Sequence, residues 1–288
     1  MRIAVLSSAD SWYVRDLQRA AADKHKVDPL AFSQIQSSIH TDTDVAVGTQ
    51  SLTDFDVVLV RTMPPGSLEQ VVFRMDALQR LAAGGIPVIN SPKAIEAAVD
   101  KYLTLSLLQN AGFEVPATET SQTVDEAMEG FHRLGGDVVV KPLFGSEGRG
   151  IARIADEAIA VRTFKMLTQL GAVIYQQKFI DHEGYDVRLL VIGDEVLGMR
   201  RSNQLDWRTN VSRGAKAEAI EVSSDMADQA MRAAKSVDAS IAGVDFLPAK
   251  DGRYYAIEVN AVPGWRAMAK TQEIDVAEKV LNYCCGGF

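Results

Sequence analysis

The sequence predicts an α/β (α+β) fold, in which a small parallel α/β lobe precedes two α+β lobes. Three observations support this prediction. The first 90 residues alternate strand and helix segments, a β-branched strand at 138–141 runs into a glycine-rich loop, and an apolar hairpin surrounds Asp251-Gly252. We therefore expect three domains, with the boundaries 1–90, 91–175 and 176–288.

The first domain is expected to contain a parallel sheet. Strand-like segments at 2–6, 56–60 and 86–90 are separated by helical segments near 11–24 and 67–83, and this alternation is typical of a parallel α/β lobe. The turn after the first strand, LSSAD, contains no glycine. A dinucleotide-binding lobe needs a glycine fingerprint there, which argues against the alternative of a nicotinamide-dependent or nucleotide-sugar enzyme.

Punctuating residues mark the elements of the second domain. Ser91 is suited to cap a helix, and Pro92 is suited to its first position. Gly112 ends this helix, Pro116 bounds the next strand, and a further helix ends near residues 134–136.

The third domain is rich in strands from about residue 174, and helices are expected near 225–240 and 274–283. With 288 residues and a hydrophobic fraction of 47%, the chain is long enough to bury a full core.

The composition excludes several classes of protein. A net charge of −8 argues against a nucleic-acid-binding surface. The chain shows neither a signal-peptide apolar region nor an apolar run of membrane-spanning length, so we expect a cytoplasmic protein. The only two cysteines, Cys284 and Cys285, are adjacent and form no disulfide framework. The four histidines match no metal-ligand spacing.

A glycine-rich loop follows the strand at 138–141. The stretch VVVKPLFGSEGRGI holds Gly145, Gly148 and Gly150 after Lys141, and such loops let the backbone approach a phosphate closely. The glycine spacing, with the lysine before the loop, differs from both the P-loop and the dinucleotide fingerprint. Because IARI reads as a second strand, the loop is either a flap over a nucleotide or the tip of an ordinary hairpin.

An acidic hairpin lies about a hundred residues later. If Asp251-Gly252 is a two-residue type I′ turn, Asp245 lies directly opposite Glu258, and Asn260 shares the face of Glu258. Opposed carboxylates in apolar strands repel each other, so a cation is expected between them. Carboxylate and amide oxygens suit Mg²⁺ or Mn²⁺. The alternative is a solvent-facing hairpin whose acids point apart.

Seven sequence blocks together resemble the ATP-grasp carboxylate–amine ligases, and in particular the RimK-like branch, which adds glutamate to an amine. In order between residues 61 and 279, the blocks are NSPKAIEAAVDK, VKPLFGSEGRG, QQKFIDHEGYDVRLLVIGDEV, MRR, WRTNVSRGA, GVDFL, and EVNAVPG followed by DVAEKV. The resemblance implies the ATP-grasp fold, in which two α+β lobes clamp ATP behind a small N-terminal lobe.

The resemblance also implies roles for residues at matching positions. The implied nucleotide-binding residues are Lys101, Lys141, Gly145, Ser146, Gly148, Gly150, Gln177, Lys178, Phe179, Ile180, Asp186, Arg188 and Arg200. The implied metal ligands are Asp245, Glu258 and Asn260. Arg201, Arg208 and Asn210 are the implied catalytic residues, which together with Arg188 and Arg200 would hold the carboxylate substrate and the phosphoryl group during transfer. Each has an ordinary alternative as a solvated surface charge or part of a flexible loop.

Four positions depart from the family pattern. Lys178 stands where relatives commonly carry a glutamate at the adenine edge, which leaves the nucleotide preference open. Ala215 replaces a usual glycine. Trp265 and Arg266 stand where RimK has smaller or acidic residues, in a segment expected to line the acceptor pocket, which leaves the acceptor open.

The implied activity is that of an ATP-dependent ligase. The γ-phosphoryl group of ATP would move to a carboxylate, and an amine would attack the acyl phosphate, releasing ADP and phosphate. We expect ATP and Mg²⁺ (or Mn²⁺), a small-molecule or peptide amine, L-glutamate as the acid, and a homo-oligomer. A surplus of arginines favours glutamate, namely Arg188, Arg200, Arg201, Arg208 and Arg266.

Two alternatives stay open, a D-amino-acid or lysine-biosynthesis ATP-grasp ligase and a non-catalytic ATP-binding module.

The expected repulsion between Asp245 and Glu258 also gives a prediction for stability. Because Asp245→Asn and Glu258→Gln each relieve this repulsion, we expect them to leave the metal-free protein no less stable.

Overall fold

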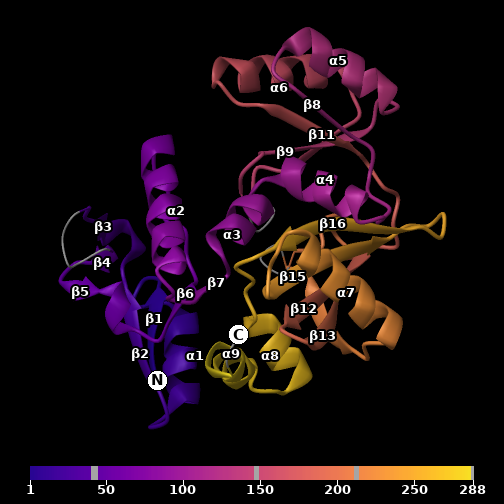
Figure 1. The fold of residues 1–288 in the computed structure, drawn as a ribbon. Coiled ribbons are helices and arrows are strands. Elements are labelled where there is room, and N and C mark those ends of the chain that lie inside the picture. The colour runs from indigo at the N-terminus through magenta and orange to yellow at the C-terminus, as the bar shows by residue number, and fades with distance from the viewer. Residues whose placement is uncertain (40–44, 146–148, 211–213, 287–288) are drawn as a thin grey trace.

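The computed structural model describes residues 1–39, 45–145, 149–210 and 214–286. These residues form an N-terminal, a central and a C-terminal lobe (Figure 1). The N-terminal lobe has a parallel sheet, and the sheets of the two lobes that follow are antiparallel. The predicted fold class is confirmed.

The N-terminal lobe is built on four parallel strands in the order β2-β1-β6-β7. They are β1 (Arg2–Leu6), β2 (Lys26–Leu30), β6 (Val57–Val60) and β7 (Val88–Ile89). Its two helices are α1 (Trp12–Ala21) and α2 (Leu68–Ala83). The alternation predicted for this lobe is confirmed, but β2 escaped the sequence pattern because Asp28 and Pro29 interrupt its apolar run.

A second, small antiparallel sheet in this lobe was not predicted. Its strands are β3 (Ile35–Ser37), β4 (Val45–Val47) and β5 (Gln50–Ser51), flanked by the 3₁₀ helices η1 (Phe32–Gln34) and η2 (Leu52–Asp54). These segments are too short to show a clear hydrophobic period.

The single helix predicted after Ser91 is instead a pair of helices. They are α3 (Pro92–Val99) and α4 (Lys101–Asn110). Asp100 separates them, because its backbone is extended and its carboxylate accepts hydrogen bonds from the amides of Tyr102 and Leu103. Asp100 is therefore the N-cap of α4, and it places Lys101 at the first position of that helix.

The central lobe contains an antiparallel sheet in the order β10-β9-β11-β8. Its strands are β8 (Thr118–Ser121), β9 (Val138–Lys141), β10 (Ala152–Ile154) and β11 (Ile174–Lys178), and its helices are α5 (Val124–Arg133) and α6 (Glu157–Gln169). Helix α6 was not predicted. Because β11 belongs wholly to this sheet, we draw the boundary with the C-terminal lobe after Lys178.

The C-terminal lobe is a five-stranded antiparallel sheet in the order β14-β13-β12-β15-β16. Its strands are β12 (Tyr185–Ile192), β13 (Glu195–Ser202), β14 (Lys216–Ile220), β15 (Ile241–Pro248) and β16 (Tyr254–Asn260). Helix α7 (Ser224–Ser236) covers one face, where Ala230 and Ala233 pack with Val187, Leu189 and Val244.

The last two helices join this lobe to the N-terminal lobe. They are α8 (Arg266–Gln272) and α9 (Val276–Cys285). Val280 of α9 shares a buried core with Leu17 of α1 and with Leu190 and Met199 of the C-terminal sheet. In Figure 1, α8 and α9 lie between the two lobes. This core covers one half of the second face of the sheet and leaves the other half open.

No helix in the part of the chain that the structure describes is long and apolar enough to cross a membrane. Cys284 and Cys285 are free thiols.

Candidate active site

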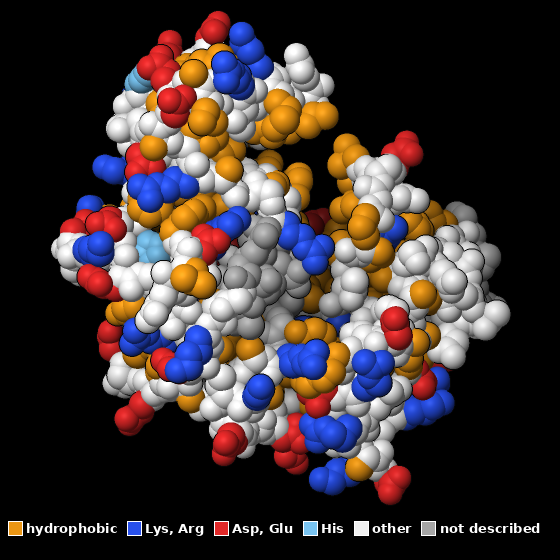
Figure 2. Space-filling model, turned by 180° about the vertical axis from the view of Figure 1, so that it is seen from behind, with side chains coloured by type: hydrophobic (Ala, Val, Ile, Leu, Met, Phe, Trp, Pro, Cys, Tyr) orange, Lys and Arg blue, Asp and Glu red, His pale blue; other side chains and the backbone are white. Residues whose placement is uncertain are grey.

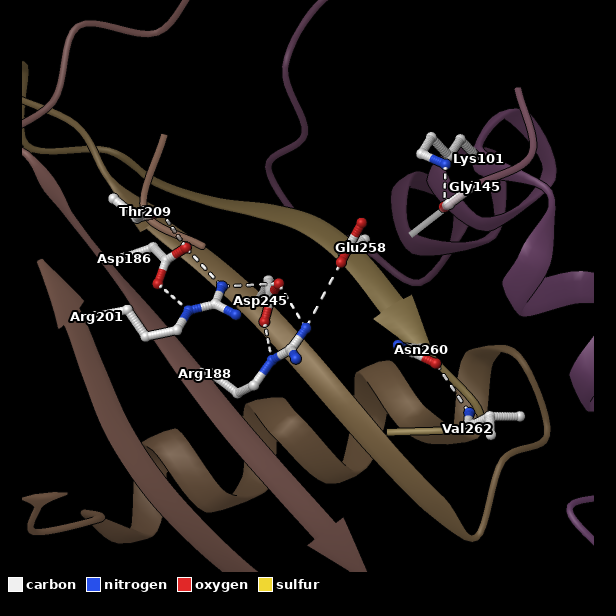
Figure 3. Close-up of polar contacts among 10 residues, drawn as sticks. All are labelled: Lys101, Gly145, Asp186, Arg188, Arg201, Thr209, Asp245, Glu258, Asn260 and Val262. Carbon is white, nitrogen blue, oxygen red and sulfur yellow. Dashed lines mark hydrogen bonds and ion pairs between the residues drawn. The ribbon is translucent and has the colours of Figure 1, made fainter. Parts of the chain in front are cut away.

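The open half of the C-terminal sheet carries a group of charged side chains on one face. Asp186 pairs with Arg201 across β12 and β13, Arg188 pairs with Asp245 across β12 and β15, and Asp245 pairs with Glu258 across β15 and β16. Because directly opposite residues of a sheet share a face, all five side chains point to the same side (Figure 3).

The pairing of Asp245 with Glu258 was predicted correctly from a turn that is wrong. Pro248 pairs with Tyr254, and the amide of Ala249 donates to the carbonyl of Arg253 at 2.9 Å. The loop therefore contains three residues, 250–252, with Gly252 in the left-handed region at φ +84°. This register alone would place Asp245 opposite Ile257. A β-bulge between Asp245 and Phe246 adds one residue and restores the pairing with Glu258.

The five charged side chains form a continuous chain of ion pairs. Arg188 binds Asp245 through two hydrogen bonds, Nε to Oδ1 at 2.6 Å and Nη2 to Oδ2 at 2.8 Å. Arg201 binds Asp186 through two bonds of 2.7 and 2.6 Å, and its Nη2 lies 2.9 Å from Asp245 Oδ2. The chain ends at Glu258, whose Oε1 lies 3.6 Å from Arg188 Nη2. Negative and positive groups alternate along it.

The two facing carboxylates differ in their surroundings. Burial opposes ionisation of Asp245, but Arg188 and Arg201 outweigh it and hold the pKa of Asp245 well below its usual value. Burial, followed by the negative charge of Asp245, raises the pKa of Glu258. The Glu258 side chain is 38% exposed, against 6% for Asp245. Glu258 is therefore the acid that is available to a ligand.

Two lysines from the central part of the chain face this acidic pair. Lys101 begins α4, and its Nζ donates to the carbonyl of Gly145 at 2.7 Å. Lys141 ends β9, and its Nζ donates to Gln177 Oε1 at 2.7 Å. Burial lowers the pKa of Lys141 to about 8, although the negative charge of Glu258 opposes this shift. Both lysines are close enough to Glu258 to interact with its charge.

A cavity of about 120 Å³ lies between the central and C-terminal lobes. Its lining includes twelve of the predicted site residues, namely Lys101, Lys141, Gln177, Lys178, Phe179, Ile180, Asp186, Arg201, Arg208, Asn210, Asp245 and Glu258. The apolar residues of the lining include Val139, Ile151, Leu247 and Ile257. An apolar region next to converging lysines matches the two ends of a nucleotide, a flat base and a charged phosphate chain.

Because of the bulge in β16, this cavity is lined by both an apolar and an acidic residue of that strand. Ile257 has no partner on β15, because Ala256 pairs with Phe246 and Glu258 pairs with Asp245. Neighbours in a regular strand point to opposite faces, whereas Ile257 and Glu258 both line the cavity.

A loop at 203–210 closes one side of the cavity. Arg208 binds the carboxylate of Asp206 through its Nε at 2.9 Å and its Nη2 at 2.6 Å. Thr209 is 7% exposed, and its hydroxyl bonds to Asp186 Oδ2. Thr209 was missed in the sequence because a threonine in a polar loop carries no local signal.

Comparison with known protein families identifies the fold family. The chain matches the RimK-like ATP-grasp domain over residues 98–284 and the RimK pre-ATP-grasp domain over residues 1–95. The chain belongs to the RimK-like ATP-grasp family.

Relatives of this RimK-like chain are named ligases. It is 30% identical to the tetrahydromethanopterin:alpha-L-glutamate ligase of Methanosarcina acetivorans, over 96% of both chains. It is 31% identical to the ribosomal protein bS6–L-glutamate ligase of Escherichia coli O139:H28, over 98% of this chain and 95% of the relative. The RimK-like chain is thus an ATP-grasp ligase, as predicted, and the alternative of a non-catalytic module is set aside.

Solved structures show the same fold. The RimK domain ATP-grasp protein of Sphaerobacter thermophilus superposes with a TM-score of 0.77 at 23% identity, covering 99% of this chain and all (100%) of that one. The ATP-grasp ligase PsnB, complexed with a minimal precursor, Mg and ADP, gives a TM-score of 0.76 at 22% identity, covering 99% and 96% of the chains. The predicted ATP-grasp fold is confirmed.

Two residues predicted for the RimK-like nucleotide site lie differently from expectation. Arg200 points to the opposite face of β13 from Arg201, and its guanidinium lies over the ring of Tyr185 at 4.1 Å. We therefore leave it out of the site. Asp186 was expected to bind the nucleotide, but Arg201 and Thr209 already bond to its carboxylate.

The predicted surplus of arginines is wrong. Arg188, Arg201 and Arg208 are each paired with a carboxylate, and the exposed Arg266 lies over the ring of Trp12 at 5.4 Å. Trp265, expected to line the acceptor pocket, is fully buried. The arginines therefore give no support to glutamate as the acid.

The glycine-rich loop is described in part. Ser146 and Gly148 lie outside the described residues. Gly145 and Gly150 both have positive φ, at +145° and +70°, and a Cβ at Gly150 would lie 2.9 Å from Pro142 Cγ. Gly150 therefore meets both a conformational and a steric need.

The donor set fits a hard divalent cation in this RimK-like site. Asp245, Glu258 and Asn260 lie on one face of the hairpin, and they supply the oxygen ligands that Mg²⁺ prefers. Asn260 Oδ1 accepts a hydrogen bond from the amide of Val262 at 2.8 Å, which orients the side chain. Within the described ranges, no group of three or more His, Cys, Asp or Glu side chains could hold a metal.

Proposed function

We propose that this chain joins L-glutamate to the amine of a small molecule or peptide, using ATP and Mg²⁺. The observation that carries the proposal is the convergence of Lys101 and Lys141 with the Asp245–Glu258 pair on one cavity between two lobes. The names of the relatives support L-glutamate as one of the two substrates that are joined. The two relatives name different acceptors, so their names leave the acceptor of this chain open.

The nucleotide is proposed to bind with its base at the apolar end of the cavity and its phosphates at the lysines. Val139, Leu247 and Ile257 would contact the base. The backbone amide of Ile180 makes no hydrogen bond to any described residue, so it is free to donate to a base nitrogen. Lys178 also lines the cavity and is exposed, so it would lie at the edge of the base.

The phosphoryl group is proposed to move to the substrate carboxylate beside Asp245 and Glu258. Lys101 and Lys141 would bind the phosphate oxygens, and Asp245, Glu258 and Asn260 would hold the metal. Bound Mg²⁺ would neutralise the phosphate charge as a Lewis acid. Because Arg188 occupies both oxygens of Asp245, its guanidinium would move aside as the metal binds and would then be available to the transferring group.

The loop that begins at Gly145 is proposed to cover the phosphates. Lys101 already contacts it through the Gly145 carbonyl. A cover of this kind would exclude water, which otherwise hydrolyses an acyl phosphate before the amine attacks. Arg208 and Asn210, on the loop opposite, would contact the substrate carboxylate.

The acceptor is proposed to enter between the lobes. Figure 2 shows a cleft between the central and N-terminal lobes, with hydrophobic side chains on both walls and Lys and Arg side chains at its base. A cleft open to solvent would admit a large acceptor.

We further predict that the protein is a homo-oligomer, which sedimentation velocity would test.

The test uses hydroxylamine as a surrogate amine. The protein is incubated with ATP, Mg²⁺ and each amino acid in turn, and hydroxamate and ADP are measured together. We expect both products with L-glutamate, because the trap intercepts an acyl phosphate without the true amine. Equal signal from all amino acids would overturn glutamate while leaving the ligase class intact. Glu258→Gln is the control, since it should remove both products without unfolding the chain.

A further inference from the structure

The N-terminal lobe contains a buried arginine that has no acidic partner among the residues that the structure describes. Arg61 follows β6 and is 7% exposed. Its Nη2 donates to the carbonyl of Pro263 at 2.6 Å, and its buried Nε has no hydrogen-bond partner. No carboxylate of the described residues lies within 4.0 Å of the guanidinium. Burial lowers the pKa of Arg61 to about 10, so it remains charged at neutral pH.

The surroundings of Arg61 differ from those of Arg201, another buried arginine. Arg201 is equally buried, at 3% exposure, but it is bound to both Asp186 and Asp245. A buried charge without a counter-charge destabilises a fold, whereas a compensated one does not. Arg61 therefore lacks the carboxylate partners that compensate the buried charge of Arg201, and an anionic ligand would supply such a partner.

Aromatic rings hold the Arg61 guanidinium in position. Its Cζ lies 4.3 Å from the ring centroid of Trp265 and 5.0 Å from that of Tyr13. The two rings meet edge to face, with centroids 4.9 Å apart. Trp265 is fixed in turn, because its Nε1 donates to Asp16 at 3.0 Å. The guanidinium is thus oriented before any ligand binds, which lowers the entropic cost of binding.

The location of Arg61 is one where α/β sheets bind ligands. Arg61 follows the carboxyl end of β6, which lies beside the carboxyl end of β1. In the strand order β2-β1-β6-β7, β2 lies on one side of β1 and β6 lies on the other, so the strand order reverses between β1 and β6. Ligands of open α/β sheets bind in the crevice outside such a switch point. Two hydroxyls lie there, since Ser7 Oγ and Thr62 Oγ1 are 3.1 Å apart and Thr62 is exposed.

Arg61 is also close to the charged face of the C-terminal sheet. A Cβ at Gly243 would lie 3.1 Å from the Pro263 side chain and 3.6 Å from Arg188 Cζ. Arg61 bonds to the carbonyl of the same proline. Pro263 therefore connects Arg61 to Gly243 and Arg188, and a substrate spanning this distance could touch both.

We propose that Arg61 binds a carboxylate group of a substrate, at the junction of the N-terminal and C-terminal lobes. The carboxylate belongs either to the amino acid that is added or to the acceptor. The inference rests on the proposed function for its substrate, but its geometry is independent of which amino acid is used.

Stability measurements test the proposal without turnover. Arg61→Met removes the charge and keeps a flexible side chain against the two rings. We expect its unfolding midpoint in denaturant, without substrate, to equal or exceed that of the unsubstituted protein. Arg201→Met is the matched control, and its midpoint should fall because two buried carboxylates lose a partner. L-glutamate and succinate should raise the melting temperature of the unsubstituted protein above that in sodium chloride of equal ionic strength, and this gain should vanish in Arg61→Met.

The hydroxylamine assay identifies the source of the carboxylate. A rise of about tenfold or more in the KM for L-glutamate, with the KM for ATP within twofold, assigns it to the added amino acid. An unchanged KM for glutamate, together with loss of the succinate effect, assigns it to the acceptor. Arg61→Lys keeps the charge but loses the guanidinium group, which can bind a carboxylate through two hydrogen bonds. It should therefore show a smaller change in KM and in stabilisation by carboxylates than Arg61→Met. If Arg61→Met does not fold, Arg61→Lys provides the test.

Equal stabilisation of the unsubstituted and substituted chains by every carboxylate would overturn the proposal. So would a substrate-free Arg61→Met or Arg61→Lys chain as unstable as Arg201→Met, because Arg61 would then be structural. Absence of hydroxamate with every amino acid would instead count against the glutamate ligase function, and the melting temperatures would still test Arg61.

Discussion

Asp245 and Glu258 lie directly opposite each other in the β15–β16 ladder, and one arginine contacts both. Arg188 binds the buried Asp245 through two short hydrogen bonds and lies 3.6 Å from the more open Glu258. The repulsion expected between the two acids is therefore already relieved by protein groups. This arrangement changes what substitutions at the two positions should do.

Asp245→Asn and Glu258→Gln should both abolish Mg²⁺-dependent turnover but differ in stability. Glu258→Gln removes a carboxylate whose pKa is raised by burial and by Asp245, so the free protein should be no less stable. Asp245→Asn leaves Arg188 and Arg201 without their shared partner and should lower the free energy of unfolding by about 3 kcal/mol. The sequence-based expectation that Asp245→Asn leaves the metal-free protein no less stable is thus revised. Urea unfolding curves without metal check it, and equal midpoints for both variants would refute the revision.

Arg188→Met should tighten the binding of Mn²⁺ in the absence of nucleotide by about tenfold, because the metal no longer competes with a guanidinium for Asp245. Electron paramagnetic resonance of free Mn²⁺ measures the affinity directly. Arg200→Met is the control, since Arg200 lies on the opposite face of the sheet. A similar change in both variants would mean that net charge, rather than competition for Asp245, sets the affinity.

Lys141→Met should stabilise the free protein at pH 7 while weakening ATP binding. Burial lowers the pKa of Lys141 to about 8, so the unfolded chain binds more protons between about pH 8 and 10.4, and stability of the unsubstituted protein rises with pH in that window. Lys141→Met lacks this rise, so its advantage of roughly 1–3 kcal/mol at pH 7 should disappear by about pH 10.5. Urea unfolding from pH 7 to 10.5 provides the measurement, and parallel pH profiles would show that Lys141 titrates normally.

Thr209→Val should lower kcat by about tenfold, because the loop that carries Arg208 and Asn210 loses its hydrogen bond to Asp186. Thr209→Ser keeps the hydroxyl and should restore most of the rate. The KM for ATP should change little in either variant. If valine and serine reduced kcat equally, the methyl group rather than the hydrogen bond would position the loop.

The sequence by itself determined the parts of this protein that depend on local pattern. Alternation of strand and helix predicted the parallel lobe, and a β-branched run ending at Lys141 predicted the strand that leads into the glycine-rich loop. Period-two alternation placed Glu258 and Asn260 on one face. Such features follow from backbone geometry over a few residues, so they can be inferred without knowing what packs against them.

Only the tertiary structure decided which charges already have partners. Arg200 and Arg201 are adjacent in sequence, yet one lies over Tyr185 on the far face and the other joins Asp186 to Asp245. Arg61 is left without an acid because β6 and the segment after β16 meet from distant parts of the chain. The partner of a buried charge is set by contacts between strands that are far apart in sequence. The local sequence pattern around the charged residue does not predict those contacts.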